Sequence, residues 1–507
     1  MKFTRSCTLL ALVVASLSAN AAQPIYEIFD MGIVGADTSS QGTRVSNNGT
    51  ATGRSLSSNQ ASAFTLSGGG ITVGLPKLTV PSRTYHQGNG INGFGDVVGV
   101  AATTFFGSNR LPVMWKGGLI SQVPMPAGQT SGQAWDITDD GRIVGSINGG
   151  SLERAFYFDG TNSNVITSTT PAGQYFVTAY GISENGIVVG QGWDPVNAAI
   201  TVGMKYDANT VISDLVPPVS GDNSVINFDI SGNGTFVTGT SSINGGSGGK
   251  AFIWSEAAGT VAVPIPSGSS SSIGRGVNNN GWTVGNSSSA FSVPWVNDGF
   301  TTYKLADVIN NYATSGWNLL TNTSSSALGI NDSGAISGTG VKNGLTRGYV
   351  MRPKNVPITG SIVVVGGLPT YQGESISVIL KNRGGQTNQL ARYPNVALTA
   401  SGEFSFNSNF IGLMTITVKG ESTLAKALGS DLSAAGLQTN PYLLINGDGD
   451  GDNEVGPGDF ELVVSKFGLD SSSSEYVKAV DLDRDGEIGP SDFEIVVGNF
   501  GIAGDEF

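Results

Sequence analysis

The chain has very little of the chemistry on which most catalytic sites depend. Its 507 residues include one cysteine, Cys7, and one histidine, His86. A Cys–His pair, a Ser–His–Asp triad and a metal site built from several histidines are therefore nearly excluded. Only 13% of the residues are charged, which argues against long surface helices and coiled coils. The net charge of −13 argues against general binding to nucleic-acid backbones, because such binding places lysine and arginine on the phosphates.

Glycine, in contrast, is abundant, with 74 residues. A composition rich in glycine and poor in charge favours many short strands joined by tight turns. Hydrophobic residues make up 39% of the chain, which is enough for a sizeable core, and the length allows two to four domains. We therefore expect a mainly all-β protein with several domains.

The first residues have the pattern of a secretory signal peptide. Lys2 and Arg5 precede an apolar run over residues 8–17, and Ala19-Asn20-Ala21 offers small residues for cleavage. The alternative is a membrane anchor, but the run is shorter than the ~20 residues that span a bilayer. We predict a signal peptide over residues 1–21, a secreted or cell-surface location and no transmembrane segment. The mature chain would lack cysteine and so have no disulfides.

A hairpin motif occurs seven times in the first two thirds of the chain. Each copy has a polar residue, two further turn residues and a glycine, followed by a short β-prone stretch. Successive turn glycines are 46, 46, 45, 48, 47 and 53 residues apart. Asn-Gly and Asp-Gly suit tight hairpins because they tolerate positive φ. The copies are Ser46-Asn47-Asn48-Gly49, Asn92-Gly93-Phe94-Gly95, Thr138-Asp139-Asp140-Gly141, Ser183-Glu184-Asn185-Gly186, Ser231-Gly232-Asn233-Gly234, Asn278-Asn279-Asn280-Gly281 and Asn331-Asp332-Ser333-Gly334.

A second motif follows each hairpin: a small residue, a large apolar one, any residue, and usually an aromatic. Ala155-Phe156-Tyr157-Phe158 and Ala251-Phe252-Ile253-Trp254 are clear examples, and a further apolar strand comes next. Each unit thus offers about four short strands, which is the size of one propeller blade. Residues 22–355 are predicted to form a seven-bladed β-propeller; the alternative is an open stack of β-hairpins.

The two ends of this region favour a closed ring. The last copy ends at Gly348-Tyr349-Val350-Met351 without the apolar strand that should follow, and the segment 25–30 is such a strand without a unit of its own. Pairing the two would close the ring and remove an exposed sheet edge. The repeats resemble the HAF-type extracellular repeat over residues 24–355. The Ala-Phe of its signature is kept and the His is lost. This resemblance implies an exported β-propeller with no established reaction.

No catalytic and no cofactor-binding residue is predicted in the repeats. The acidic residues are scattered, and Asp139 and Asp140 are interpreted as turn residues. His86 is expected to be exposed in a loop over residues 81–90. Loop aromatics such as Tyr85, Tyr180 and Trp193 either stack on sugar rings or pack between blades, and packing is the simpler interpretation.

The middle region predicts a small β-sandwich, because apolar residues alternate in short runs between residues 356 and 428. Gly402-Glu403-Phe404-Ser405-Phe406 resembles strands of secreted carboxypeptidase-regulatory or immunoglobulin-like modules. Its expected role is that of a spacer. Residues 423–428 are predicted to form a short helix, and residues 429–445 a linker.

The last 62 residues hold 16 acidic and 3 basic residues, a net charge of −13. Two segments of this tail align 33 residues apart, and both place carboxylates at positions 1, 3, 5 and 12 of a twelve-residue loop. This spacing wraps oxygen ligands around Ca²⁺, with the backbone carbonyl of position 7 as a further ligand. We therefore predict two calcium ions. The predicted metal residues are Asp448, Asp450, Asp452, Glu454 and Asp459 in the first loop and Asp481, Asp483, Asp485, Glu487 and Asp492 in the second.

A helix is expected after each loop. Pro457 and Pro490 suit a first helical turn, and Gly468 and Gly501 suit the stop. The alternative is a disordered acidic tail, because an uncompensated charge of this size repels itself. Loop followed by helix, duplicated over residues 446–507, resembles a type I dockerin, a calcium-binding domain with an EF-hand-like loop. The resemblance implies a docking role.

One departure from the dockerin pattern concerns the partner. Dockerins usually carry small hydroxyl residues at loop positions 10 and 11 to contact a cohesin, whereas this chain has Pro457-Gly458 and Pro490-Ser491. These residues depart from those that contact a classical cohesin, and a cohesin-like or cell-surface protein is the expected partner.

Two functions remain open on the sequence. The first is a non-enzymatic protein whose propeller serves adhesion, scaffolding or ligand capture and whose dockerin-like tail attaches it. The second is an enzyme or lectin that acts on polysaccharide and is tethered by the same tail. Convergent carboxylates beside exposed aromatics in the channel would favour the second.

Overall fold

The computed structural model describes residues 21–507 apart from positions 59, 105, 106, 108, 150–152, 366, 367, 369 and 384–387. The predicted signal peptide, except for Ala21, lies outside the described residues. Strands make up 51% of the chain and helices 6%, so the predicted mainly all-β fold is confirmed. The chain divides into two compact units, Tyr26–Pro353 and a second unit of the residues up to Ile25 with Lys354–Phe507. No helix in the described part of the chain is long and apolar enough to cross a membrane.

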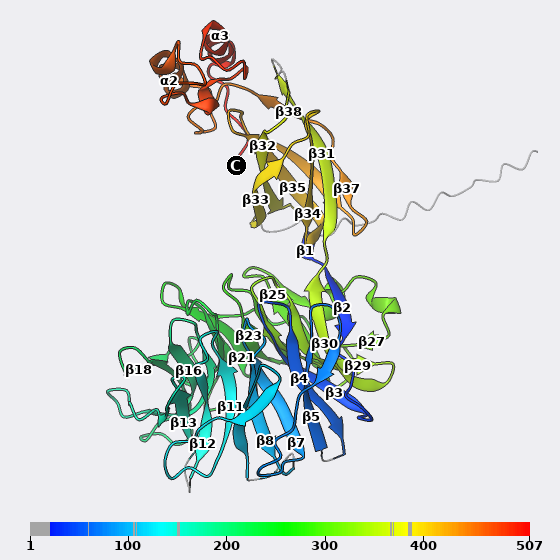
Figure 1. Ribbon diagram of the computed structural model, residues 1–507, viewed down its shortest axis with the longest axis vertical. Helices are drawn as coiled ribbons and strands as arrows, with labels where there is room; N and C mark the ends of the chain where they lie inside the picture. The colour runs from blue at the N-terminus through cyan, green and yellow to red at the C-terminus, as the bar shows by residue number, and fades with distance from the viewer. Residues whose placement is uncertain are drawn as a thin grey trace, which may run out of the picture. The chain divides into compact units, whose positions relative to one another are not determined.

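The unit Tyr26–Pro353 consists of sheets in which strands that are consecutive in the chain pair antiparallel (Figure 1). An eight-stranded sheet contains two such runs: β3 (Ser39–Val45), β4 (Ala51–Ser57), β5 (Gln60–Leu66), β6 (Thr72–Gly74) and then β7 (Tyr85–Ile91), β8 (Val97–Ala102), β9 (Leu111–Lys116), β10 (Leu119–Gln122). The single bridge that joins the two runs is parallel, between Ala61 and Tyr85.

Four-stranded sheets follow in the same order. They contain β11 (Ser131–Ile137), β12 (Ile143–Asn148), β13 (Glu153–Phe158), β14 (Ser163–Val165); β15 (Tyr175–Ile182), β16 (Ile187–Trp193), β17 (Thr201–Asp207), β18 (Ile212–Val216); β19 (Ser224–Ile230), β20 (Val237–Ser242), β21 (Lys250–Ser255), β22 (Gly259–Ala262); and β23 (Ser271–Val277), β24 (Thr283–Ser288), β25 (Ser292–Asn297), β26 (Thr302–Lys304). A short helix α1 (Leu305–Val308) and the 3-10 turn η1 (Tyr312–Thr314) lead to the final sheet, which contains β27 (Trp317–Asn318), β28 (Ser326–Ile330), β29 (Ile336–Lys342), β30 (Leu345–Pro353) and β2 (Tyr26–Asp30).

The seven predicted hairpin turns are all present; six lie between the first and second strand of a run, and the seventh lies between β28 and β29. Their glycines have φ between 77° and 90°, a conformation that glycine adopts without strain. These turns contact one another in sequence, and the last contacts the first. The linking hydrogen bonds are Asn48 Nδ2 to Gly93 O, Asn92 Nδ2 to Thr138 O, Asp139 N to the Glu184 carboxylate, Asn185 Nδ2 to Asn233 O, Asn233 N to Asn279 Oδ1, Asn278 Nδ2 to Asn331 O and Asn331 Nδ2 to Ser46 O.

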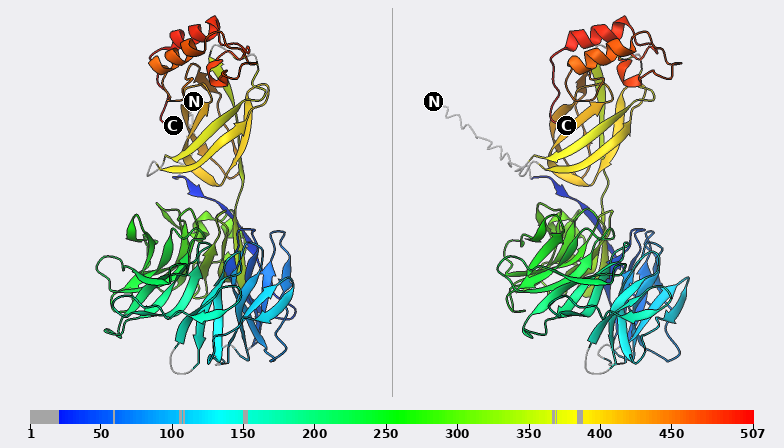
Figure 2. Two further views of the ribbon diagram at one scale, coloured as in Figure 1. Left: turned by 60° about the vertical axis from the view of Figure 1, so that its left-hand side comes forward. Right: turned by 90° about the vertical axis from the view of Figure 1, so that its left-hand side faces the viewer.

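The predicted pairing of the two ends is confirmed. Strand β2 pairs antiparallel with β30, with Tyr26 opposite Pro353 and Asp30 opposite Tyr349. In Figure 2 the blue β2 lies beside the yellow-green end of the same unit. The apolar cores lie between successive sheets; one contains Val98 of β8 together with Ile137, Ile143 and Phe156 of the next sheet. The repeats therefore pack through their faces as well as through their turns.

The prediction of an exposed loop histidine is wrong. His86 is fully buried in β7, and its Nε2 accepts a hydrogen bond of 2.9 Å from the backbone N–H of Leu78. Burial lowers its pKa to about 4, so the ring is neutral at physiological pH. Pro81 and Ser82 do form a loop, but the strand begins at Tyr85, earlier than the polar sequence suggests.

The second unit contains two sheets. One pairs β1 (Gln23–Pro24), β32 (Ser375–Asn382), β33 (Gln389–Ala397), β35 (Phe410–Gly420) and β36 (Lys426–Leu432), and the other pairs β31 (Val356–Val365), β34 (Glu403–Ser408), β37 (Leu437–Gln438) and β38 (Tyr442–Ile445). Neither the predicted helix over residues 423–428 nor the predicted linker over 429–445 is present, because β36, β37 and β38 occupy these segments. Tyr442 and Leu444 alternate with exposed neighbours and are buried, which is a strand pattern too short to stand out in the sequence.

Candidate functional site

The acidic tail folds into two loops and two helices that repeat each other. Helix α2 (Pro457–Lys466) follows the first loop, and α3 (Pro490–Asn499) follows the second, after a short 3-10 turn η2 (Lys478–Val480). Both helices begin at the predicted prolines. The predicted apolar loop residues Val455 and Ile488 are fully buried in one cluster with Val463 of α2 and Val496 of α3. The Phe460 and Phe493 rings, 5.2 Å apart, contact each other between the helices.

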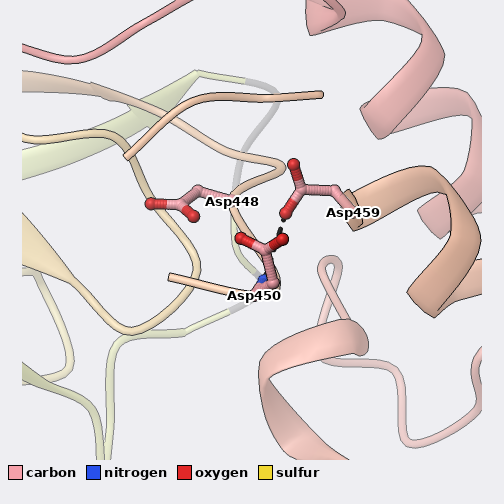
Figure 3. Close-up of side chains that lie close together, drawn as sticks. All are labelled: Asp448, Asp450 and Asp459. Carbon is pink, nitrogen blue, oxygen red and sulfur yellow. Dashed lines mark hydrogen bonds between the residues drawn. The ribbon is translucent and has the colours of Figure 1, made fainter. Parts of the chain in front are cut away.

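Each loop brings three aspartates together. In the first loop Asp448, Asp450 and Asp459 each offer a carboxylate oxygen within 4.8 Å of the others, and Figure 3 shows these side chains around one point. In the second loop Asp481, Asp483 and Asp492 form the equivalent group. These are positions 1, 3 and 12 of each loop. Either group could hold a metal ion through oxygen ligands.

Hydrogen bonds from the loop backbone hold the position 12 aspartates, Asp459 and Asp492, beside the other two aspartates of each group. Asp459 lies in the first turn of α2, where its two oxygens accept hydrogen bonds from Gly449 N and Gly456 N, both at 2.7 Å. Asp492 does the same from α3 with Leu482 N and Gly489 N. The sharp turn at position 6 is also present, with φ of 74° at Asn453 and 95° at Gly486. Helix start and loop are thereby fixed to each other.

The remaining predicted ligands lie outside the two groups. The side chains of Asp452 and Asp485, at position 5, are exposed and accept hydrogen bonds from the backbone N–H groups of Glu454 and Glu487. The Glu454 and Glu487 side chains, at position 7, are also exposed. Exposure of these two glutamates agrees with a contribution by backbone carbonyl and not by side chain.

One carboxylate oxygen in each loop is buried without a hydrogen-bond partner among the described residues. These atoms are Oδ1 of Asp448 and Oδ1 of Asp481, which occupy position 1 of their loops and whose residues are at most 1% exposed. A buried carboxylate oxygen without a partner is costly. Burial, reinforced by the Asp459 and Asp452 carboxylates, raises the pKa of Asp450. The donor set therefore fits a hard divalent cation, which would pair with these oxygens and offset the repulsion.

Two neighbours of the position 1 aspartates are not evident from the sequence. Lys419, on β35, places its ammonium against Asp448 Oδ2, and it also donates to Thr423 O at 3.1 Å. In the second loop Asp481 Oδ2 instead accepts a hydrogen bond from the Tyr476 hydroxyl at 2.5 Å. The loops thus differ, since the position 1 aspartate contacts a lysine ammonium in the first loop and a neutral tyrosine hydroxyl in the second. Lys419 is 29 residues from Asp448, so no local pattern reveals it.

The unit Tyr26–Pro353, which we call the ring unit, contains a second group of charges, in which Asp229 is buried and Arg44 and Asp136 are partly buried. Arg44, on β3, forms an ion pair of 2.8 Å with Asp229 of β19. Asp136, on β11, also lies near Arg44, and its Oδ2 accepts a hydrogen bond from Ile182 N. These strands belong to three different sheets, so the two carboxylates do converge. Asp229 uses both oxygens, one on Arg44 and the other on Val277 N.

Asp136 is expected to make the stability of the protein depend on pH. Burial raises its pKa to about 7 from 3.8, with the Asp229 carboxylate adding to the shift and Arg44 opposing it. Between pH ~4 and ~7 the carboxyl ionises in the unfolded state but stays protonated in the folded state. The stabilisation is therefore complete below pH ~4 and is lost as the pH rises to ~7. Asp136→Asn should therefore raise the free energy of unfolding at pH 8 by on the order of 2 kcal/mol and change it little at pH 4.

The measurement is thermal unfolding of wild type and Asp136→Asn across pH 4 to 8 with saturating calcium. Asp214→Asn is the control, because Asp214 is exposed on β18. An Asp136→Asn profile parallel to that of the wild type would contradict the assignment.

No protein-family model matches the chain, and no curated protein is similar to it. Solved structures give low similarity. A mutant type II cohesin–X-dockerin complex from Acetivibrio cellulolyticus matches 30% of this chain and 99% of its own at 19% identity, with a TM-score of 0.25. TolB from Acinetobacter baumannii matches 53% of this chain and 63% of its own at 11% identity, with a TM-score of 0.35. Dipeptidyl peptidase 4 from Porphyromonas gingivalis matches 77% and 58% at 8% identity, with a TM-score of 0.37.

Proposed function

We propose that this chain is an exported, non-enzymatic attachment protein. A seven-bladed β-propeller of HAF-type repeats would be displayed by a small β-sandwich, and a dockerin-like domain that folds around two calcium ions would attach it at the cell surface. The observation that carries the proposal is the repeated metal group, in which each loop gathers three aspartates and leaves one buried oxygen without a partner.

The propeller assignment is supported by the closed series of turn contacts and by the β2–β30 pairing. In this view the eight-stranded sheet represents two blades joined by one bridge, and the remaining sheets represent one blade each. Closure pairs the edge of β30, and the outer strands that remain, such as β14, β22 and β26, are only three or four residues long, which favours a protein that persists outside the cell without disulfides.

Calcium is the favoured ion because every predicted ligand is an oxygen and carboxylates are the hard ligands that calcium prefers. Asp448, Asp450 and Asp459 would hold one ion, and Asp481, Asp483 and Asp492 the other. Asp452 and Asp485, with the carbonyls of Glu454 and Glu487, would complete the two sets. Bound calcium supplies positive charge, and the residues of the loops then hold α2 and α3 in place.

Lys419→Met is expected to raise the calcium affinity of the first loop about tenfold, which corresponds to ~1.4 kcal/mol. The Lys419 ammonium contacts Asp448, so it competes with a metal for the same carboxylate. Isothermal titration of the full chain measures the two sites. Lys426→Met is the matched control, since its ammonium pairs with Asp505, outside both loops, at 3.1 Å. An unchanged or weaker first site in Lys419→Met would show that the ammonium does not compete.

A protein partner is favoured by the exposed apolar side chains of the helices. Val464 and Phe467 at the end of α2, and Val497 and Phe500 at the end of α3, are each 51–52% exposed. The two pairs are equivalent in the repeat. Exposed apolar side chains at equivalent positions suit a cohesin-like or cell-surface protein, although loop positions 10 and 11 depart from the usual dockerin residues.

The test is retention of the full chain on the cells that produce it. We expect retention in millimolar calcium, release by EGTA, and no retention of the Asp448→Ala/Asp481→Ala variant. Retention of the wild type in EGTA, together with retention of the Asp448→Ala/Asp481→Ala variant in calcium, would contradict the proposal.

A second candidate function, a carbohydrate-binding or carbohydrate-acting propeller, is favoured by two neighbouring cavities that share Arg44. Asp136 and Asp229 line one of them, and the other is lined by aromatic side chains. Because both oxygens of Asp229 are already paired, the geometry favours binding over hydrolysis, which in glycosidases uses two carboxylates across the scissile bond.

A further inference from the structure

The strands that precede the seven turns share an irregularity. Each has a β-bulge, and the extra residue lies six positions before the turn glycine. A bulge re-aims a side chain away from the regular alternation of the strand. The extra residues are Thr43, Asn89, Trp135, Tyr180, Phe228, Arg275 and Leu328.

All seven bulge residues line one cavity of about 300 Å³, together with Arg44 and Gln87. Its lining is divided by chemistry. Trp135, Tyr180 and Phe228 come from successive runs and contact one another, with ring centroids 5.4 and 5.3 Å apart. Thr43, Gln87 and Asn89 add a hydroxyl and two amides from β3 and β7. Their side chains already donate to Gly88 O, Asn89 Oδ1 and Ala134 O, which leaves the second N–H of each amide and the lone pairs of the hydroxyl for a ligand. An aromatic wall with a few convergent polar groups is typical of a small-molecule site.

Arg275 gives this cavity its charge. Its guanidinium lies 4.3 Å from the centre of the Phe228 ring, and its buried Nε has no hydrogen-bond partner among the described residues. Nε1 of Trp135 is likewise buried without a described partner. Arg44 is different, because it is paired with Asp229. Both atoms belong to side chains that line the cavity, so Arg275 brings an unpaired positive charge to its wall and Trp135 an indole.

The charges around the cavity indicate which kind of anion it would bind. Asp136 and Asp229 line an adjoining cavity on the turn side, and Arg44 borders both cavities. Since Arg44 is occupied, Arg275 alone offers positive charge, and a doubly charged phosphate would face two carboxylates nearby. A single carboxylate matches one guanidinium. The flat aromatic wall suits a ring, and the amide and hydroxyl wall suits ring hydroxyls.

We propose that this cavity binds a hexuronic acid, with the carboxylate on Arg275, the sugar ring against Trp135 and Tyr180, and hydroxyls on Thr43, Gln87 and Asn89. This inference deepens the second candidate function and rests on the ring of strands, not on the metal loops.

The experiment is isothermal titration of the full chain in calcium with D-galacturonate and D-glucuronate. D-galactose is the uncharged control and benzoate the aromatic carboxylate. We expect at least one uronate to bind with a Kd below about 1 mM, and both galactose and benzoate to bind at least tenfold more weakly. Tight benzoate binding would overturn the sugar assignment, and absence of uronate binding would overturn the whole inference.

Arg275→Gln should weaken uronate binding at least tenfold while leaving galactose binding unchanged. The matched control is Arg154→Gln, because Arg154 also stacks on a ring, 3.9 Å from the centre of Tyr175, outside the cavity. Unchanged uronate affinity in Arg275→Gln would contradict the proposed contact. Should Arg275→Gln fail to fold by circular dichroism, Trp135→Phe replaces the indole of the cavity wall by a smaller ring, and a loss of uronate affinity of at least threefold is expected.

The metal loops separate the two proposals. Asp448→Ala/Asp481→Ala should bind uronate as the wild type does. A wild type that binds uronate but takes up no calcium would contradict only the attachment proposal. A wild type that takes up calcium but binds no uronate would contradict only the cavity proposal.

Discussion

Replacing Asp448 and Asp481 by alanine is expected to abolish calcium-induced folding of the C-terminal segment. The two aspartates occupy position 1 of their loops, are buried, and each keeps one oxygen without a described partner. Without calcium the segment carries its 16 acidic residues nearly uncompensated, and the core around Val455 and Ile488 is small. Binding and folding are therefore coupled. Far-UV circular dichroism of the full chain should gain helical signal with calcium in the wild type and not in the double variant.

The matched control is Glu461→Ala/Glu494→Ala. These glutamates are exposed at equivalent positions of α2 and α3, so the control removes the same charge from the same elements without touching the loops. It should respond to calcium as the wild type does. If calcium changes neither the circular dichroism spectrum nor the calorimetric trace of the wild type, the attachment proposal loses its basis.

Glu27→Pro is expected to destabilise the ring unit by about 1–3 kcal/mol, because it removes a ladder hydrogen bond and leaves its acceptor unpaired. Glu27 lies opposite Arg352 in the β2–β30 pair. Lys354 N donates to Ile25 O, and Met31 N donates to Gly348 O, so every second residue from 25 to 31 is at a hydrogen-bonded position. Proline removes that N–H from the strand that closes the ring. Chemical denaturation, followed by tryptophan fluorescence, measures the loss.

Glu27→Ala is the control for this prediction, because the Glu27 side chain is exposed and its removal should change the unfolding free energy by no more than ~0.5 kcal/mol. Equal stability of the proline and alanine variants would show that closure by β2 contributes little.

The sequence predicted those features that leave a repeated or complementary pattern along the chain. The seven glycine turns, the closing strand, the prolines at the starts of α2 and α3, and positions 1, 3 and 12 of the loops all follow from spacing and residue type. Positions 5 and 7 stay predictions, because Asp452 and Glu454 lie outside the groups that the structure brings together.

The features that escaped prediction depend on partners far away in the chain. Lys419 reaches Asp448 from strand β35, and β36 pairs with β35 over residues that were predicted as the end of a short helix and the start of a linker. His86 is buried by strands that surround it and not by its own neighbours. The bulge residues, from Thr43 to Leu328, share a position in the repeat but not a residue type. They form no recognisable motif in the sequence, and their equivalence shows only when the strands are aligned on their turns.

The short strand β1 carries a consequence for how the chain is cut. Residues 23–24 pair with β35, whereas residues 26–30 belong to the ring, so the ring is an insertion within the second unit. Two covalent crossings join the units, at residues 25–26 and 353–354. A protease that nicks either crossing leaves the other intact, and shedding of the ring requires both cuts.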